Sequence, residues 1–121
     1  MILGLRTTIY PVADLEAAKG WYSEMLGQKP YFDQPFYVGF SVGGFELGLL
    51  PNAEPGTAGS QTLWGVEDIH SAYQRLLDLG AAELEAVAEV GEGIKVAALK
   101  DPFGNRFGII ENPVFDPKAV R

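Results

Sequence analysis

The segment DPFGNRFGIIE, residues 101–111, decides the fold because it encodes a tight turn followed by a strand. Asp101 and Pro102 suit the first two positions of a type I turn. Gly104 supplies the positive φ that lets the chain reverse into a hairpin. Alternation along residues 106–111 then places Gly108 on the sheet face opposite Phe107. A glycine therefore stands where one face of the strand would otherwise carry a side chain.

Composition and charge limit the classes of protein to consider. A chain of 121 residues with 47% apolar residues is long and apolar enough for one folded domain. The net charge of −7 and the pI near 4.5 argue against binding to nucleic acids or anionic membranes. The absence of cysteine excludes disulfides, thiol catalysis and thiolate metal sites. The N-terminus becomes polar too early for a signal peptide, and no apolar run is long enough to span a membrane, so we expect a cytoplasmic protein.

Both halves of the chain show the order strand, helix and then further strands. In the first half we expect a strand at 5–12, a helix that follows Asp14 and ends at Gly27, and strands at 28–33, 36–42 and 45–50. In the second half we expect a strand at 61–66, a helix from Asp68 to Gly80, and strands at 83–90, 94–100 and 106–111. Residues 51–60, rich in Pro, Gly, Ala and Ser, have the composition of a linker.

The two halves also match position by position. Val12 corresponds to Val66 and Asp14 to Asp68, each pair 54 residues apart. We interpret the match as an internal duplication of a βαβββ unit. The alternative is that any two strand–helix junctions look alike, but the strands and turns that follow repeat as well.

The chain resembles the vicinal oxygen chelate superfamily, which includes glyoxalase I, bleomycin-resistance proteins, fosfomycin-resistance enzymes and extradiol dioxygenases. The resemblance rests on VADL at 12–15 with WY at 21–22, on residues 66–80, and above all on the DPFGNR turn at 101–106. It implies an α+β fold of two βαβββ modules in one domain, whose curved, mostly antiparallel sheets enclose a cleft. The modules would span residues 3–50 and 61–112, joined by a linker at 51–60 and followed by a C-terminal arm at 113–121. It also implies a homodimer.

The resemblance and strand alternation together predict which side chains line the cleft. The expected ligand-binding residues are Thr7, Ile9, Glu46, Gln61, Leu63, Gly108 and Ile110. Some of the neighbouring aromatic residues are expected at its rim: Tyr31, Phe32, Phe36, Tyr37 and Phe103.

In metal-dependent members of the superfamily, side chains at four positions of this cleft bind the metal. By resemblance they fall on Thr7, Gln61, Gly108 and either Glu46 or Gly48. Threonine is a poor ligand, glycine offers none, and one carboxylate with one amide is too few for a divalent cation. We therefore expect no metal and no cofactor.

Glu46 is the candidate catalytic residue, as a general base. A carboxylate that faces an apolar cleft is expected to have a raised pKa. The alternative is a glutamate on an edge strand that reaches solvent or an arginine. The only histidine, His70, is expected to be a solvated residue in the first turn of the second helix.

Two classes of function remain. The first is a metal-independent binding protein that sequesters a small, drug-like or cationic organic ligand, as bleomycin-resistance proteins do. The second is a lyase, isomerase or dioxygenase of the glyoxalase type, with an atypical metal site or with Glu46 as base. The depleted set of metal ligands favours binding.

Overall fold

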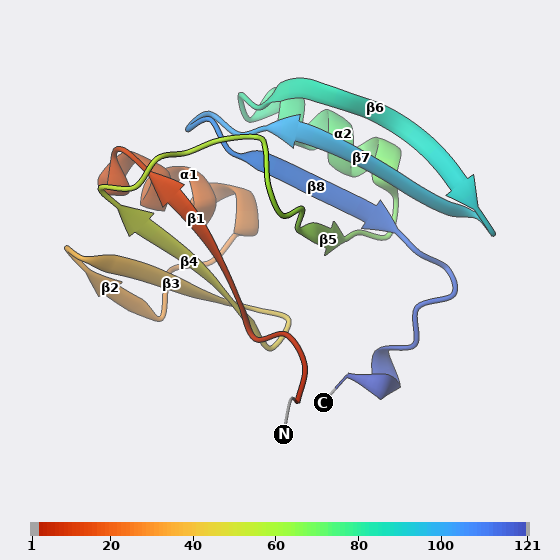
Figure 1. Cartoon of the computed structure of the whole chain (residues 1–121), viewed down its shortest axis with the longest axis horizontal. Helices are drawn as coiled ribbons and strands as arrows, with labels where there is room; N and C mark the ends of the chain where they lie inside the picture. The colour runs from red at the N-terminus through yellow and green to blue at the C-terminus, as the bar shows by residue number, and fades with distance from the viewer. Residues whose placement is uncertain (1–2, 121) are drawn as a thin grey trace. The chain divides into compact units, whose positions relative to one another are not determined.

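The computed structural model describes residues 3–120 and divides into two compact units, residues 1–56 and 57–121 (Figure 1). The first unit contains β1 (Thr7–Val12), α1 (Leu15–Leu26), β2 (Phe32–Gln34), β3 (Tyr37–Val42) and β4 (Phe45–Pro51). The second contains β5 (Leu63–Gly65), α2 (Ile69–Asp78), β6 (Ala82–Gly91), β7 (Ile94–Lys100), β8 (Arg106–Glu111) and a short 3-10 helix, η1 (Pro117–Ala119). The α+β class and the repeated βαβββ order are thus confirmed. That the two units join into one domain stays a prediction.

Each unit has a four-stranded sheet with the same connectivity. The strand order is β1-β4-β3-β2 in the first unit and β5-β8-β7-β6 in the second. The first and last strands of each unit pair in parallel, and the other pairs are antiparallel. Parallel strands need a crossover connection, and in each unit the helix lies in the segment that follows the first strand.

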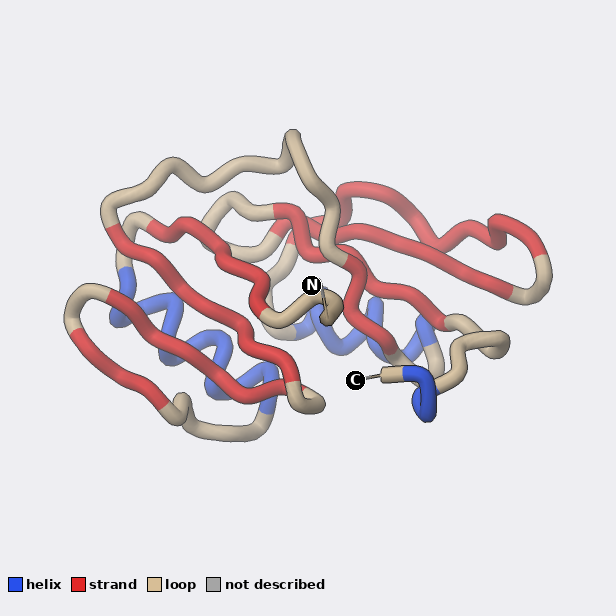
Figure 2. The backbone as a smooth tube through the Cα atoms, turned by 60° about the horizontal axis from the view of Figure 1, so that its bottom comes forward, coloured by secondary structure: helices blue, strands red, loops and turns tan. Residues whose placement is uncertain are grey.

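One helix covers one face of each sheet, as Figures 1 and 2 show. In the first unit, Tyr10 of β1 stacks on Tyr22 of α1 with ring centroids 6.0 Å apart. In the second, Trp64 of β5 stacks on Phe107 of β8 at 6.1 Å, beneath α2. The fully buried core side chains of the first unit are Val12, Ala18, Tyr22, Val38, Phe40, Leu47 and Leu49. Burial of this set leaves the alternate residues of each strand on the open face.

The helix ends follow the expected local chemistry. The Asp14 carboxylate accepts the backbone N–H of Ala17 at 3.0 Å, and Asp68 accepts those of His70 and Ser71. Gly27 ends α1 in the left-handed conformation with φ 68°. His70 is exposed, as expected.

The turn at 101–105 closes around a buried carboxylate. Asp101, 2% exposed, accepts the N–H groups of Phe103 and Asn105 at 3.0 and 2.8 Å. Gly104 has φ 94° and donates its N–H to the Asp101 carbonyl at 3.2 Å. The turn predicted from Asp101, Pro102 and Gly104 is confirmed, and it delivers β8 beside β7.

Several expected boundaries were wrong by two or more residues, and the first strand begins at Thr7 rather than at residue 5. The strand predicted at 28–33 instead runs from Phe32 to Gln34, because Pro35 and Phe36 form the tight turn into β3. The region after β4 has no helix or strand from 52 to 62, so β5 begins later than predicted. No helix within residues 3–120 is both long and apolar enough to cross a membrane.

Candidate functional site

The open face of the first unit's sheet carries the polar and small residues that alternate with its core. On β1 these are Thr7 and Ile9, on β4 they are Glu46 and Gly48, and Gly39 lies on β3. Glu46 pairs with Thr7 on one side and with Ser41 on the other, so β4 is an interior strand. The alternative of an edge-strand glutamate was therefore wrong.

Two glycines give this face its shape. Gly39 and Gly48 lie directly opposite each other across β3 and β4. A Cβ at Gly48 would overlap the Tyr37 hydroxyl and lie 2.5 Å from its ring carbon Cζ. A Cβ at Gly39 would lie 2.8 Å from Glu46 Oε2 and 3.3 Å from Tyr31 Cε1. Only glycine at both positions leaves room for the two tyrosine side chains and the carboxylate.

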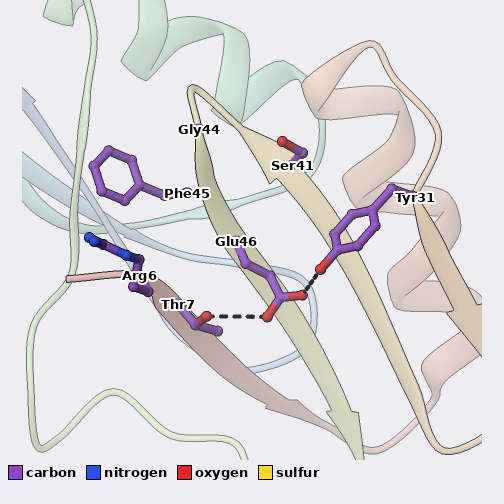
Figure 3. Close-up of a pocket in the computed structure, with 7 residues that line it drawn as sticks. All are labelled: Arg6, Thr7, Tyr31, Ser41, Gly44, Phe45 and Glu46. Atoms are coloured by element: carbon purple, nitrogen blue, oxygen red, sulfur yellow. Dashed lines mark hydrogen bonds between the residues drawn. The ribbon is translucent and has the colours of Figure 1, made fainter. Parts of the chain in front are cut away.

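Three hydroxyl groups converge on the Glu46 carboxylate. Thr7 donates to Oε1 at 3.2 Å and Tyr37 donates to the same oxygen at 3.0 Å. Tyr31 donates to Oε2 (Figure 3). The three donors come from β1, from β3 and from the segment before β2. Strand pairing therefore assembles the site from distant parts of the unit.

These hydrogen bonds decide the ionisation of the site. They lower the pKa of the Glu46 carboxyl, Tyr31 contributing most, and outweigh the opposing effect of burial. Burial first, and then the hydrogen bond to Glu46, raises the pKa of Tyr37 to about 12. The hydrogen bond to Glu46 also raises the pKa of Tyr31. At neutral pH the group is thus one carboxylate held by neutral hydroxyls. The expected raised pKa of Glu46 was wrong, because hydroxyl donors rather than an apolar wall surround it.

The carboxylate borders an open hollow of about 360 Å³. Thr7, Tyr31 and Glu46 line its polar side. The other lining residues are Arg6, Ser41, Gly44 and Phe45. Figure 3 shows the Arg6 and Phe45 side chains extending away from the Glu46 carboxylate.

No lysine or arginine within residues 3–120 forms an ion pair with Glu46. Its negative charge is stabilised by dipoles alone and is not neutralised. A carboxylate of this kind, in a hollow with an aromatic side chain beside it, attracts a cation.

The second unit lacks such a group at the corresponding position. Ile9 pairs with Gly48 in the first unit, and Leu63, 54 residues after Ile9, pairs with Gly108 in the second. Gly48 and Gly108 are therefore equivalent, and Glu46 corresponds to Arg106. The open choice between Glu46 and Gly48 for the ligand position of the first module thus falls, by this register, on Gly48.

The residues at the family's metal positions do not fit a metal centre of that kind. Neither Gly48 nor Gly108 has a side chain, and the Thr7 hydroxyl already donates to Glu46. A Cβ at Gly108 would lie 2.5 Å from the carbonyl oxygen of Thr62, so the backbone fills the space of a ligand side chain. Within residues 3–120, no three His, Cys, Asp or Glu side chains gather in a metal-binding group. We derive no reaction step through a metal.

The predicted site residues separate into two sets. Thr7 and Glu46 are in contact, and Ile9, 50% exposed, lies beside them on the same face. The others belong to the second unit: exposed Gln61 before β5, half-exposed Leu63, buried Gly108 and partly buried Ile110. A single site that contains all seven residues stays a prediction. Gly108 leaves no open volume for a ligand, because Thr62 and Leu63 occupy the space where a side chain would begin.

The sequence did not reveal that Tyr31 and Tyr37 hold Glu46, although both were expected at a rim. One signal was present. Gly39 and Gly48 stand four residues on either side of the Gly43-Gly44 turn, which places them opposite each other in a hairpin. Paired glycines in adjacent strands indicate that another group lies over them.

Solved structures share this fold over nearly the whole chain. A glyoxalase-related enzyme from Fulvimarina pelagi is 23% identical, with a TM-score of 0.75 over 95% of this chain and 92% of that one. A protein from Agrobacterium tumefaciens is 22% identical, with a TM-score of 0.77 over 91% and 98%. A member of the glyoxalase/bleomycin resistance protein/dioxygenase superfamily from Sphaerobacter thermophilus is 21% identical, with a TM-score of 0.75 over 92% and 98%. At these sequence identities, the structural similarity establishes a shared fold and nothing more specific.

The family follows from the sequence. Residues 4–109 match the model of the Glyoxalase/Bleomycin resistance protein/Dioxygenase superfamily, and the chain belongs to it. The resemblance drawn from the DPFGNR turn is thereby confirmed. No curated protein sequence matches the chain.

Proposed function

We propose that this protein is a metal-independent small-molecule binding protein of the glyoxalase/bleomycin-resistance type that sequesters a cationic organic ligand. The observation that carries the proposal is the ionised Glu46 carboxylate at the edge of an open hollow, held by three hydroxyls and paired with no lysine or arginine of residues 3–120. Hydroxyl donors orient a carboxylate without neutralising it, so it keeps its attraction for a cation. The Tyr31 ring supplies an aromatic surface beside it.

The lowered pKa of Glu46 favours binding over base catalysis. A general base works best when its pKa lies near the working pH, and these hydrogen bonds move the pKa of Glu46 the other way. The glycines at positions 48 and 108 favour independence from metal, because they provide no ligand.

The test compares ligands of similar shape that differ in charge. Isothermal titration calorimetry would measure the binding of benzyldimethylammonium, neutral benzyl alcohol and anionic phenylacetate at pH 7, with and without EDTA. We expect the cation to bind best and EDTA to change nothing. Glu46→Gln keeps the shape and removes the charge, so it should weaken the cation about ten-fold and leave benzyl alcohol unaffected. Equal affinity for all three compounds in the wild type would refute the proposal.

The proposal includes a cytoplasmic homodimer. Several large apolar side chains are more than half exposed in the described chain, among them Phe36, Val90 and Phe115. Exposed apolar surface of this kind favours association with a second copy. Light scattering that gave the mass of one chain at micromolar concentration would contradict the dimer and leave the binding proposal intact.

A further inference from the structure

The two oxygens of the Glu46 carboxylate differ in the donors that they already accept. Oε1 accepts both Thr7 and Tyr37, which fills the two positions of a carboxylate oxygen. Among the residues that the structure describes, only the Tyr31 hydroxyl donates to Oε2. A ligand donor must therefore bind at Oε2.

Tyr31 and Gly39 together restrict access to Oε2. The backbone of Gly39 lies against both groups, since a Cβ there would be 2.8 Å from Oε2 and 3.3 Å from Tyr31 Cε1, and it leaves no room for a ligand donor. Tyr31 itself lines the hollow. A donor that approaches from the hollow meets Oε2 at the place now held by the Tyr31 hydroxyl (Figure 3).

The Tyr31 side chain can leave this position without moving the backbone. Its N–H donates to the Gly39 carbonyl at 3.0 Å, which anchors the main chain, while the residue is 64% exposed. Rotamer changes of exposed side chains are fast and cost little. The half-buried Tyr37 is different, because its hydroxyl lies over Gly48 in the sheet.

We propose that the ligand is a protonated organic amine with at least one N–H, and that this N–H takes the place of the Tyr31 hydroxyl on Glu46 Oε2. The inference rests on the proposed function and makes it specific. Primary, secondary and tertiary ammonium groups qualify, whereas a quaternary ammonium group has no N–H to exchange. Tyr31 then occupies the ligand's position in the free protein, and its released ring stays beside the hollow as an aromatic wall.

The experiment combines a series of N-methylated probes with two matched variants. Benzylammonium, benzyldimethylammonium and benzyltrimethylammonium would be titrated by NMR at pH 7 into the wild type, Tyr31→Phe and Tyr37→Phe, with benzyl alcohol as the neutral reference. Each variant removes one hydroxyl and keeps the ring. The ring signal of Tyr31, assigned by its loss in Tyr31→Phe, reports directly whether the hydroxyl leaves Glu46.

We expect the wild type to prefer the two N–H amines to the quaternary probe by about ten-fold. Tyr31→Phe should bind these amines about five-fold more tightly, because one competing hydrogen bond is gone, and should leave the quaternary probe unchanged. Tyr37→Phe should not tighten any of them, because the position that it frees on Oε1 lies over Gly48, and Tyr37 does not line the hollow. The Tyr31 ring signal should shift with the amines only.

Several results would refute the replacement of the Tyr31 hydroxyl by a ligand N–H but leave the proposed cation-binding site intact. These are weaker amine binding by Tyr31→Phe, an equal gain in Tyr37→Phe, or a quaternary probe that binds as well as the amines. If benzyl alcohol binds as tightly as every cation, the proposed function fails as well, so the two failures are distinguishable.

Discussion

Replacement of Gly48 by alanine tests the packing on which the site depends. The added Cβ would overlap the Tyr37 hydroxyl and lie 2.5 and 2.9 Å from two of its ring carbons. Real Cβ atoms do not approach so closely, so Tyr37 must move away from Glu46. The variant should therefore be less stable, and its Glu46 carboxylate should lose the hydrogen bond from Tyr37.

The expected cost follows from three contributions. A half-exposed hydrogen bond to a charged group contributes about 1.5 kcal/mol to the free energy of unfolding, at the low end of its range. Displacement of the Tyr37 ring from the glycine pair costs about 1 kcal/mol, because apolar ring surface becomes exposed. In the opposite direction, replacing a glycine within a strand stabilises the protein by about 0.5–1 kcal/mol, because the unfolded chain has fewer conformations to lose. The net loss is about 1.5–2 kcal/mol, in the ordinary range for overpacking.

Urea unfolding followed by tryptophan fluorescence can measure this loss within the first unit. The chain has two tryptophans, Trp21 on α1 and Trp64 on β5, so a Trp64→Phe background leaves the signal of α1 alone. Gly20→Ala is the control, because nothing lies within 4 Å of its added Cβ, and it should stabilise the unit. In a Tyr37→Ala background, Gly48→Ala should cost nothing.

The reasoning also predicts a change in the site itself. Loss of the Tyr37 donor should raise the pKa of Glu46, measured from its carboxyl carbon signal in NMR. If Gly48→Ala stabilises the protein as Gly20→Ala does, the described packing of Tyr37 on Gly48 is wrong. A cost that persists in the Tyr37→Ala background would place the clash elsewhere.

Three further predictions concern other contacts. Gly108→Ala should lower the free energy of unfolding by about 1–3 kcal/mol, since its Cβ meets the Thr62 carbonyl, whereas Gly65→Ala, with open space, should not. Because the folded-state pKa of Glu46 is lowered, its stabilisation is complete above the usual glutamate pKa of about 4.3 and is lost as the pH falls through the folded-state value. The stability difference between wild type and Glu46→Gln should therefore shrink only in acid. Asp101→Ala should cost about 2–3 kcal/mol in urea unfolding, because two backbone N–H groups lose their buried acceptor, and Asp101→Asn should cost less.

The fold could be predicted because its signals are local. Asp14 and Asp68 begin helices wherever an apolar stripe follows, and Asp101 with Gly104 forces a reversal before β8. These signals depend only on nearby backbone groups. The strand at 28–33 was placed too early because Lys29 and Pro30 disfavour a strand, and pairing with β3 fixes the position of β2.

The site was harder to predict because its determinants lie across strands. Alternation correctly placed Thr7 and Glu46 on one face, but the sign of the pKa shift depends on which side chains reach the carboxylate. Tyr31 and Tyr37 reach it only because Gly39 and Gly48 are opposite each other, a matter of register rather than composition. The space at Gly108 likewise depends on the path of residue 62 beside it.

The contrast between the two units explains why we place the ligand on the first. Two residues before its paired glycine, each last strand carries a charged side chain, Glu46 in β4 and Arg106 in β8. Arg106 is already neutralised, because it donates to both carboxylate oxygens of Glu85, at 3.1 and 2.7 Å. Glu46 is surrounded by neutral hydroxyls and keeps its charge. At equivalent positions within residues 3–120, the second unit thus has an ion pair and the first an unpaired carboxylate at the edge of a hollow. A ligand of opposite charge can bind to such a carboxylate.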